Sequence, residues 1–142
     1  MKLKLILKER LFYIRYTWRH KIAFLKVEKK VRGKNTLRGL LHDADKLFLY
    51  ALPFIDIQTA QNIHTKYARH HLRNNIQKTQ KDIEETVIDW ACAPLTKPDK
   101  PLNAYQTLIK YYPNHVEQIL PTIKKWFPEQ IKKNSLKSKE RE

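Results

Sequence analysis

Apolar residues recur every three or four positions over the first thirty residues of the chain. The stripe consists of Leu7, Leu11, Ile14, Trp18, Ile22 and Leu25. This spacing predicts one long amphipathic helix whose apolar stripe packs into the core. Gly33 interrupts the pattern, and Thr36 is a good N-cap for a second helix that runs to about Tyr50, where Pro53 stops it.

Two further helices are indicated before the middle of the chain. Asp56 is a suitable N-cap for a third helix that continues to about Arg73. Thr79 followed by Asp82 resembles a capping box at the start of a fourth helix. A proline-rich loop is expected next, because three prolines follow closely on one another. These are Pro94, Pro98 and Pro101.

The last third of the chain predicts two shorter helices, at about Leu102–Tyr112 and Val116–Trp126, with Asn114 and Glu117 forming a capping-box pattern before the second. No strand or internal repeat is evident. The pattern therefore predicts an all-α fold, a single-domain compact bundle of about six helices over residues 1–131. Residues 132–142 have the composition of a disordered basic tail.

Composition narrows the possible functions. With only two glycines in 142 residues, the chain contains neither a P-loop nor a dinucleotide-binding fingerprint. The 29 Lys and Arg against 14 Asp and Glu give a net charge of +15, which favours an anionic partner. A single cysteine, Cys92, excludes an internal disulfide and lies among apolar residues, so we expect an inert core thiol.

No apolar run approaches the roughly 18–20 residues that a membrane-spanning helix needs. The first residues alternate lysine with Leu and Ile and lack the apolar centre of a signal peptide. We therefore expect a cytoplasmic protein without membrane insertion.

The residues with the clearest chemistry are His42 and Asp43, which are adjacent within an apolar segment. Burying an imidazole and a carboxylate among leucines costs several kcal/mol unless each finds a partner. A metal ion satisfies both side chains at once, and this mixture of nitrogen and oxygen donors suits zinc, iron or manganese. His20 and Asp89, each in the middle of a predicted helix beside apolar residues, are the natural further ligands.

The order of these residues resembles the HD-domain superfamily of metal-dependent phosphohydrolases. Leu41-His42-Asp43-Ala44-Asp45-Lys46 is similar to a Leu-His-Asp-x-x-Lys signature of that superfamily. The resemblance is closest to a group of short, uncharacterised HD-like bacterial and phage proteins, and it covers residues from about 13 to 112. Four pieces in the same order carry it: Arg19-His20-Lys21, Leu40-Leu41-His42-Asp43-x-x-Lys46, Tyr67-x-x-His70-His71 and Val87-x-Asp89-Trp90.

The resemblance implies a role for each matching residue. The primary metal ligands would be His20, His42, Asp43 and Asp89. Asp43 and Lys46 would be the catalytic residues, with Lys46 facing the substrate phosphate or holding the attacking water. The implied cofactor is a divalent ion, namely Mn, Fe or Zn, with Mg as a further possibility.

A second metal would be held by His64 with His70 or His71, and helical geometry favours His71 because it lies seven positions after His64. The chain departs from the close relatives in two places. Residues 75–78 lack their second pair of histidines, which favours one metal over two, and Asp45 stands where they usually have serine.

These observations predict a metal-dependent phosphohydrolase acting on a nucleotide or another phosphate ester, with metal-activated water attacking phosphorus. Arg19, Arg69 and Arg73 are candidates for neutralising phosphoryl oxygens. The alternative is a basic nucleic-acid-binding helical module with a structural or vestigial metal site. A third interpretation, the N-terminal helix binding an acidic membrane surface, explains less because that helix also supplies His20. The sequence indicates neither the substrate nor an oligomeric state.

Overall fold

The structure, a computed structural model, describes residues 2–139, and the side chains of residues 4–133. Within that range the chain is made of helices and connecting segments without a strand, which confirms the all-helical fold class. It divides into two compact units, Met1–Lys78 and Thr79–Glu142, and each is described by itself. A single domain over residues 1–131 therefore stays a prediction. No helix in the described range is long and apolar enough to cross a membrane.

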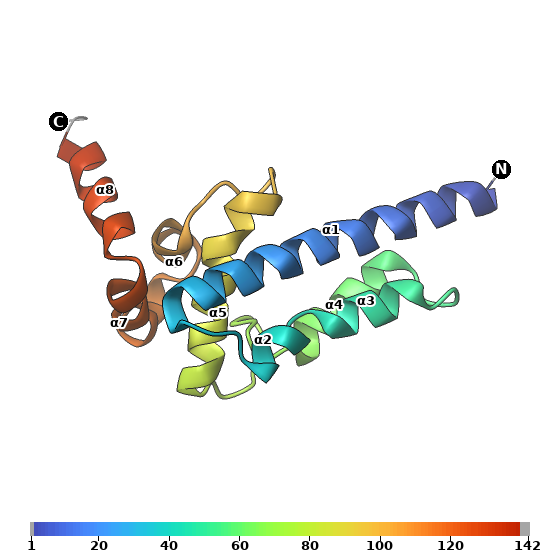
Figure 1. The fold of residues 1–142 in the computed structure, drawn as a ribbon, viewed down its shortest axis with the longest axis horizontal. Coiled ribbons are helices and arrows are strands. Elements are labelled where there is room, and N and C mark those ends of the chain that lie inside the picture. The colour runs from blue at the N-terminus through green and yellow to red at the C-terminus, as the bar shows by residue number, and fades with distance from the viewer. Residues whose placement is uncertain (1, 140–142) are drawn as a thin grey trace. The chain divides into compact units, whose positions relative to one another are not determined.

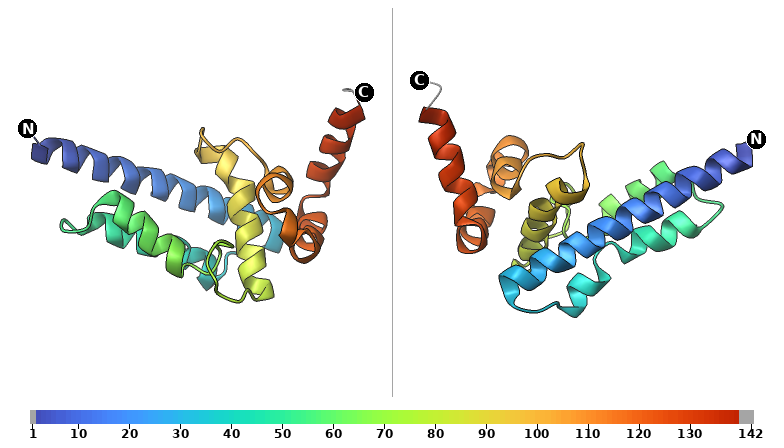
Figure 2. Two further views of the ribbon diagram at one scale, coloured as in Figure 1. Left: turned by 180° about the vertical axis from the view of Figure 1, so that it is seen from behind. Right: turned by 45° about the horizontal axis from the view of Figure 1, so that its top comes forward.

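The first unit is built on one long helix. α3 lies against this helix, and α4 lies against α3, so that both follow the same side of α1 (Figures 1 and 2). Tyr50 and Ala60 are central to the apolar contact between α3 and α4. The helices of this unit are α1 (Lys2–Arg32), α2 (Leu37–Leu41), α3 (Ala44–Ala51) and α4 (Ile57–Tyr67).

The face of α1 that is buried differs from the face that the sequence indicated. Polar and aromatic side chains lie inside, since Thr17, His20, Phe24 and Glu28 are each at most 4% exposed. The most regular apolar residues lie outside: Leu7 and Leu11 are each 51% exposed, Trp18 is 54% exposed and Ile22 is 41% exposed. For these four residues the prediction that the stripe packs into the core was wrong, whereas Ile14 of the same stripe is partly buried against the Tyr50 cluster. On the buried side Phe24 stacks on His42, and Glu28 accepts hydrogen bonds from Thr36.

Arg10 fixes the end of α3 to α1. Its guanidinium donates hydrogen bonds to the carbonyl oxygens of Tyr50 (2.9 Å), Leu52 (2.6 Å), Pro53 (3.3 Å) and Ile55 (2.5 Å). The last carbonyls of a helix have no partner within the helix, so a cation that donates to them stabilises the end. This contact positions α3 lengthwise along α1.

The second predicted helix, 36–50, is divided into α2 and α3 by His42 and Asp43. The backbone N–H of His42 donates to the Gly39 carbonyl (3.2 Å) and ends α2, and Asp43 has a left-handed backbone with a φ of 55°. Aspartate is among the residues that tolerate this conformation best. The break lets two adjacent side chains turn toward the same point, which two neighbouring positions of a continuous helix do not do.

A buried carboxylate holds α2 against α1. Glu28, 2% exposed, accepts hydrogen bonds from the backbone N–H of Thr36 (3.1 Å) and from its hydroxyl (2.6 Å). The Thr36 hydroxyl also caps α2 by accepting from the Gly39 N–H (3.0 Å), as the sequence predicted. The backbone of Gly39 lies directly against the Glu28 side chain. A β-carbon at position 39 would be 2.5 Å from the Cδ and 2.7 Å from the Oε1 of Glu28. Glycine is therefore required for this approach.

The second unit begins with the capping box that the sequence predicted, in which Thr79 and Asp82 exchange side-chain to backbone hydrogen bonds. Its core contains Cys92, a buried free thiol as expected. The other fully buried apolar residues include Val87, Ile88, Leu108, Ile119 and Ile123. The helices are α5 (Gln80–Thr96), α6 (Ala104–Tyr111), the 3-10 turn Pro113–His115, α7 (Val116–Trp126) and α8 (Pro128–Lys139).

Three expectations for the second unit differ from the structure. Pro94 lies inside α5, because a proline near the end of a helix forfeits only one or so of its hydrogen bonds. No capping box forms from Asn114 and Glu117, since the 3-10 turn precedes α7 and its N-cap, His115, makes no side-chain capping bond.

The third difference concerns the end of the chain. α8 continues to Lys139, where the sequence predicted a disordered tail from residue 132. Pro128 supplies a backbone already suited to the first turn, and the Lys and Gln residues that follow are good helix formers. The rest of the predicted tail, 140–142, lies outside the described residues.

Candidate metal centre

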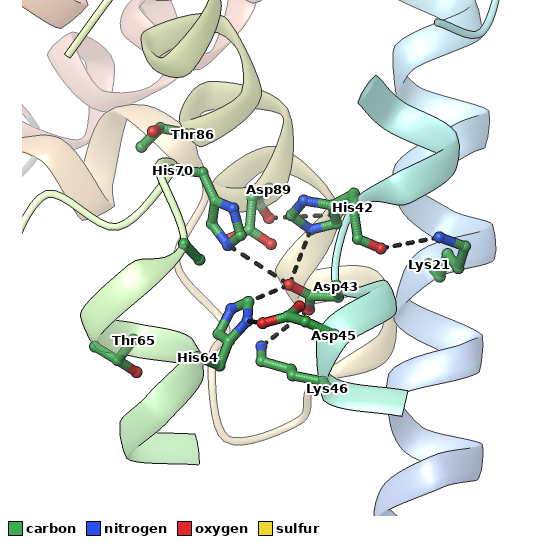
Figure 3. Close-up of polar contacts among 12 residues, drawn as sticks. Lys21, His42, Asp43, Asp45, Lys46, His64, Thr65, His70, Thr86 and Asp89 are labelled. Carbon is green, nitrogen blue, oxygen red and sulfur yellow. Dashed lines mark hydrogen bonds and ion pairs between the residues drawn. The ribbon is translucent and has the colours of Figure 1, made fainter. Parts of the chain in front are cut away.

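Three histidine rings converge on one carboxylate oxygen in the first unit (Figure 3). The Oδ1 atom of Asp43 lies 3.2 Å from Nε2 of His64, 3.5 Å from Nε2 of His70 and 3.7 Å from Nε2 of His42. These residues come from the α2–α3 break, from α4 and from the segment that follows α4. All four are at most 6% exposed. The structure thus assembles a closed, polar cluster from distant parts of the first unit.

The α2–α3 break is fixed in place from the α1 side. The Phe24 ring stacks on the His42 ring with centroids 3.9 Å apart and an interplanar angle of 15°. The Lys21 ammonium donates to the carbonyl oxygen of His42 at 2.9 Å and also to that of Leu40. Desolvation by burial lowers the pKa of Lys21, while the Asp43 charge opposes this shift. These contacts restrict the orientation of His42 before any ligand binds.

His64 is oriented by a second carboxylate. Its Nδ1 lies 2.7 Å from Oδ2 of Asp45, so this nitrogen carries the proton and donates it to the carboxylate. Burial lowers the pKa of His64, although the hydrogen bond that its Nδ1–H donates to Asp45 works in the opposite direction. A neutral ring that donates from Nδ1 has a lone pair at Nε2. The carboxylate fixes the tautomer in the manner typical of a metal-binding histidine.

The cluster leaves two acceptor atoms facing each other. Among the described residues, neither Nε2 of His64 nor Oδ1 of Asp43 has a hydrogen-bond partner, although they are 3.2 Å apart. A lone pair directed at a buried carboxylate oxygen is unfavourable unless a cation lies between them. Among the side chains that the structure describes, this arrangement is the strongest sign of a cation site.

Asp43 is held in its charged form by its neighbours. Burial alone would raise the pKa of this carboxyl, but the electrostatic attraction of His42, Lys46, His70 and His64 outweighs it and holds the pKa well below 3.8. The Lys46 ammonium contacts the other oxygen, Oδ2, at 2.9 Å. Oδ1 therefore carries negative charge toward the three imidazoles.

The donor set fits a divalent transition metal. Ligand atoms that lie about 2.0–2.2 Å from an ion are about 3.0 Å apart in octahedral geometry and about 3.4 Å apart in tetrahedral geometry. The distances of 3.2–3.7 Å between Asp43 Oδ1 and the three nitrogens are close to these values. Several imidazoles with one carboxylate suit zinc, iron or manganese better than magnesium, which prefers oxygen ligands throughout.

The other predicted ligands are placed as follows. His20, on α1, is buried, and one of its ring nitrogens groups with donor atoms of His42 and Asp43 within 4.8 Å. His71 groups in the same way with His64 and His70, so the residues proposed for a second metal do lie together. Asp89 lies on α5 of the second unit, and its part in the site stays a prediction.

The preference for His71 over His70 assumed that α4 continues through both residues. In the structure α4 ends at Tyr67, and the side-chain amide of Asn74 donates to the carbonyl oxygens of Thr65 (3.2 Å) and Ala68 (2.8 Å). The chain therefore turns, and His70 is the residue that faces Asp43. Helical spacing does not apply beyond Tyr67, and the choice between His70 and His71 as the partner of His64 at a second metal stays a prediction.

The candidate phosphate-binding residues are less closely gathered. Lys46 contacts Asp43, whereas Arg19 and Arg73 are exposed and the Arg69 guanidinium donates to the Gln77 carbonyl (3.1 Å). Their roles stay predictions. The sequence did not identify Asp45 as the partner of His64, although an aspartate where the HD-like proteins that the sequence resembles usually have serine was a signal.

Comparisons of the chain with protein-family models, curated proteins and solved structures found no match. The chemistry of the cluster must therefore be judged from its own geometry.

Removing the carboxylate of Asp45 is expected to weaken metal binding about 10–100-fold, because the His64 ring loses the partner that fixes its tautomer and raises its basicity. Asp45→Ala should show the full effect, and Asp45→Asn a smaller one, since an amide oxygen can still accept the bond. Competition with a chromophoric chelator measures the affinity. Unchanged affinity in Asp45→Ala would show that this contact does not support a metal ligand.

The free energy of unfolding of the metal-free protein should fall as the pH is lowered. The pKa of His64 lies below 6.5 in the folded state, so below pH 6.5 the unfolded chain takes up a proton that the folded chain does not. The free energy of unfolding falls further below pH 3.8, because the unfolded chain then protonates Asp43 while the folded chain, with its depressed pKa, does not. Urea denaturation between pH 7.5 and pH 5 tests the first effect. His64→Gln should reduce the slope of stability against pH, and an unchanged slope in this variant would contradict the assignment.

Proposed function

We propose that the first unit binds a divalent transition-metal ion at the histidine cluster and hydrolyses a phosphate ester there. The observation that carries this proposal is the convergence of His42, His64 and His70 on one oxygen of Asp43. The order of these residues along the chain, which resembles that of HD-type phosphohydrolases, supports the reaction class.

Each residue of the cluster has a definite task in this proposal. A divalent ion would supply the Lewis acidity that activates water and neutralises phosphoryl charge. His42, His64, His70 and Asp43 would hold the ion and leave positions open for water and a phosphate oxygen. The resemblance implies a different set for this ion, in which His20 and Asp89 take the places of His64 and His70. Lys46, whose ammonium already lies beside Asp43, would stabilise a non-bridging phosphoryl oxygen. Attack of water on phosphorus breaks the ester P–O bond and releases an alcohol.

The charge of the first unit favours anionic substrates. It contains 18 Lys and Arg against 5 Asp and Glu, a net charge of +13, whereas the second unit has 11 against 9, a net charge of +2. Such a field raises the local concentration of nucleotides and other phosphates. The same asymmetry supports the second candidate function, a nucleic-acid-binding module in which the metal is structural or vestigial.

Elemental mass spectrometry of the untagged protein is the first test. Wild type should retain close to one equivalent of iron, manganese or zinc, and His42→Ala and His64→Ala should lose it. His115→Ala, on the 3-10 turn of the second unit, is the matched control and should retain the metal. Absence of metal after reconstitution with each of the three ions would contradict the proposal.

Hydrolysis is tested on the loaded protein with p-nitrophenyl phosphate, bis-p-nitrophenyl phosphate and a set of nucleotides. Lys46→Met should retain the metal and lower kcat/KM at least about 100-fold, since it removes a charge that stabilises the transition state. A protein that binds metal and turns over none of these substrates, but binds nucleic acid with a steep salt dependence, would support the second candidate instead.

A further inference from the structure

The outward face of α1 carries an apolar row that the first unit leaves uncovered. The row is formed by Leu7, Leu11, Trp18 and Ile22, whose exposed fractions lie between 41% and 54%. At 3.6 residues per turn these positions fall within about 60° of one another around the helix axis. Four large apolar side chains in one line on a charged surface indicate a binding surface rather than scattered exposure.

A basic row runs beside the apolar one. It is formed by Lys4, Lys8, Arg15 and Arg19, all exposed. Each basic residue precedes an apolar residue of the row by three positions. Successive residues are therefore 4, 7 and 4 positions apart in both rows. Because 11 residues complete almost exactly three helical turns, both rows stay straight along the helix.

We propose that this face of α1 binds an amphipathic helix whose apolar side chains are flanked by aspartate or glutamate. The exposed side chains of Leu5 and Phe12 also lie on α1, but the basic row separates them from the apolar row. A helix lying in a membrane interface typically presents one continuous apolar face, whereas an apolar row flanked by charges is typical of a helix–helix seam. The basic row lies where the flanking charges of a partner helix would be. Trp18 supplies the large aromatic anchor that is typical of such interfaces.

Other occupants fit this face less well. A second copy of the chain would place one basic row near another, and the net charge of +13 on each first unit would oppose the contact. Nucleic acid would pair with the basic row but would leave the leucines beside it exposed to water. An acidic amphipathic helix satisfies both rows at once.

The full-length protein can be tested with a designed probe, because the natural partner is not needed. The probe is a labelled 21-residue helix with leucine along one seam and glutamate on both flanks, and its control has lysine in place of every glutamate. Fluorescence anisotropy should show saturable binding of the acidic peptide and at least about tenfold weaker binding of the lysine peptide.

Two double variants distinguish the contributions of the apolar row and the basic row to peptide binding. Leu11→Ser with Trp18→Ser removes apolar contacts, and Lys8→Glu with Arg15→Glu reverses two charges; each should weaken binding at least about tenfold. Lys34→Glu with Lys66→Glu, two exposed positions away from the rows, reverses the same number of charges and should change binding less than about twofold. Thermal unfolding checks that each variant remains folded.

Four results would overturn the proposal. The first is the absence of saturable binding of the acidic peptide. The second is binding that depends on the basic row but not on Leu11 and Trp18, which would indicate a general polyanion surface such as one for nucleic acid. The third is sedimentation of a dimer that the Leu11 and Trp18 substitutions dissociate. The fourth is binding to phosphatidylserine vesicles with no binding of the peptide, which would indicate a lipid surface.

Discussion

Asp43→Asn is expected to abolish stable metal retention, with a loss of affinity greater than the roughly 10–100-fold that follows removal of an outer-sphere partner. Asp43 Oδ1 is the single atom on which three imidazoles converge, so its charge and position affect the whole donor set. Asparagine replaces one carboxylate oxygen by an NH₂ group and removes the negative charge while keeping the size. Elemental analysis after dialysis and competition with a chelator measure the loss.

Asparagine is the informative substitution because of the backbone at this position. Asp43 has a φ of 55°, and asparagine tolerates the left-handed region as well as aspartate does. A loss of metal in this variant therefore reports the missing charge rather than a rearranged α2–α3 break. Thermal unfolding of the metal-free variant should show that the fold persists.

Asp56→Asn is the matched control in the same unit. Asp56 is exposed and caps α4 by accepting hydrogen bonds from the backbone N–H (2.9 Å) and the hydroxyl (2.7 Å) of Thr59, and asparagine is an equally good N-cap. This variant should retain metal at the wild-type level. Equal retention by both variants would contradict the assignment of Asp43 as a ligand.

Local signals in the sequence predicted much of the helical framework. Capping residues act on their own turn, so Thr36, Asp56 and Thr79 marked true helix starts without any knowledge of tertiary structure. The same reasoning failed at Asn114, where a 3-10 turn supplied a competing local geometry. Helix starts were therefore easier to predict than the connections between helices.

Tertiary contacts explain what the sequence could not show. The most regular apolar stripe of α1 predicted the core face, yet His20 and Phe24 lie inside because they contact the ring of His42 in the histidine cluster. The break at His42 and Asp43 is similarly invisible in a helical pattern, since its geometry depends on contacts that Lys21 and Phe24 make from α1. Hydrophobic periodicity reports a helix more reliably than it reports which side is buried.

The candidate site was predicted in part. Residue order assigned His42 and Asp43 to a first metal and His64 to a possible second one, and the structure brings all three residues together in one cluster. The contact between Asp45 and His64 spans 19 positions and joins α3 to α4, so only the packing of these helices reveals it. Outer-sphere partners of this kind depend on three-dimensional proximity and leave little trace in a single sequence.

Gly39→Ala is expected to lower the free energy of unfolding by about 3 kcal/mol, from the combined cost of overpacking and of displaced buried hydrogen bonds. The new β-carbon would overlap the Glu28 carboxylate, which cannot move away without giving up its hydrogen bonds to Thr36. Urea denaturation measures the effect. Gly33→Ala is the matched control: that glycine has a φ of 76° but no neighbouring atom within 4 Å, so only backbone strain of about 1 kcal/mol applies.

A double-mutant cycle assigns the cost to one contact. Glu28→Ala is itself destabilising, because the Thr36 backbone N–H and hydroxyl lose their acceptor, but it also vacates the space that an alanine at position 39 would enter. Gly39→Ala should therefore cost less than about 1 kcal/mol in the Glu28→Ala background, which gives a coupling energy of about 2 kcal/mol. Additive effects would show that Gly39 is needed for the backbone of α2 rather than for the close approach of Glu28. Because α2 leads directly into His42 and Asp43, this buried carboxylate on α1 also helps to fix the segment that carries the two proposed ligands.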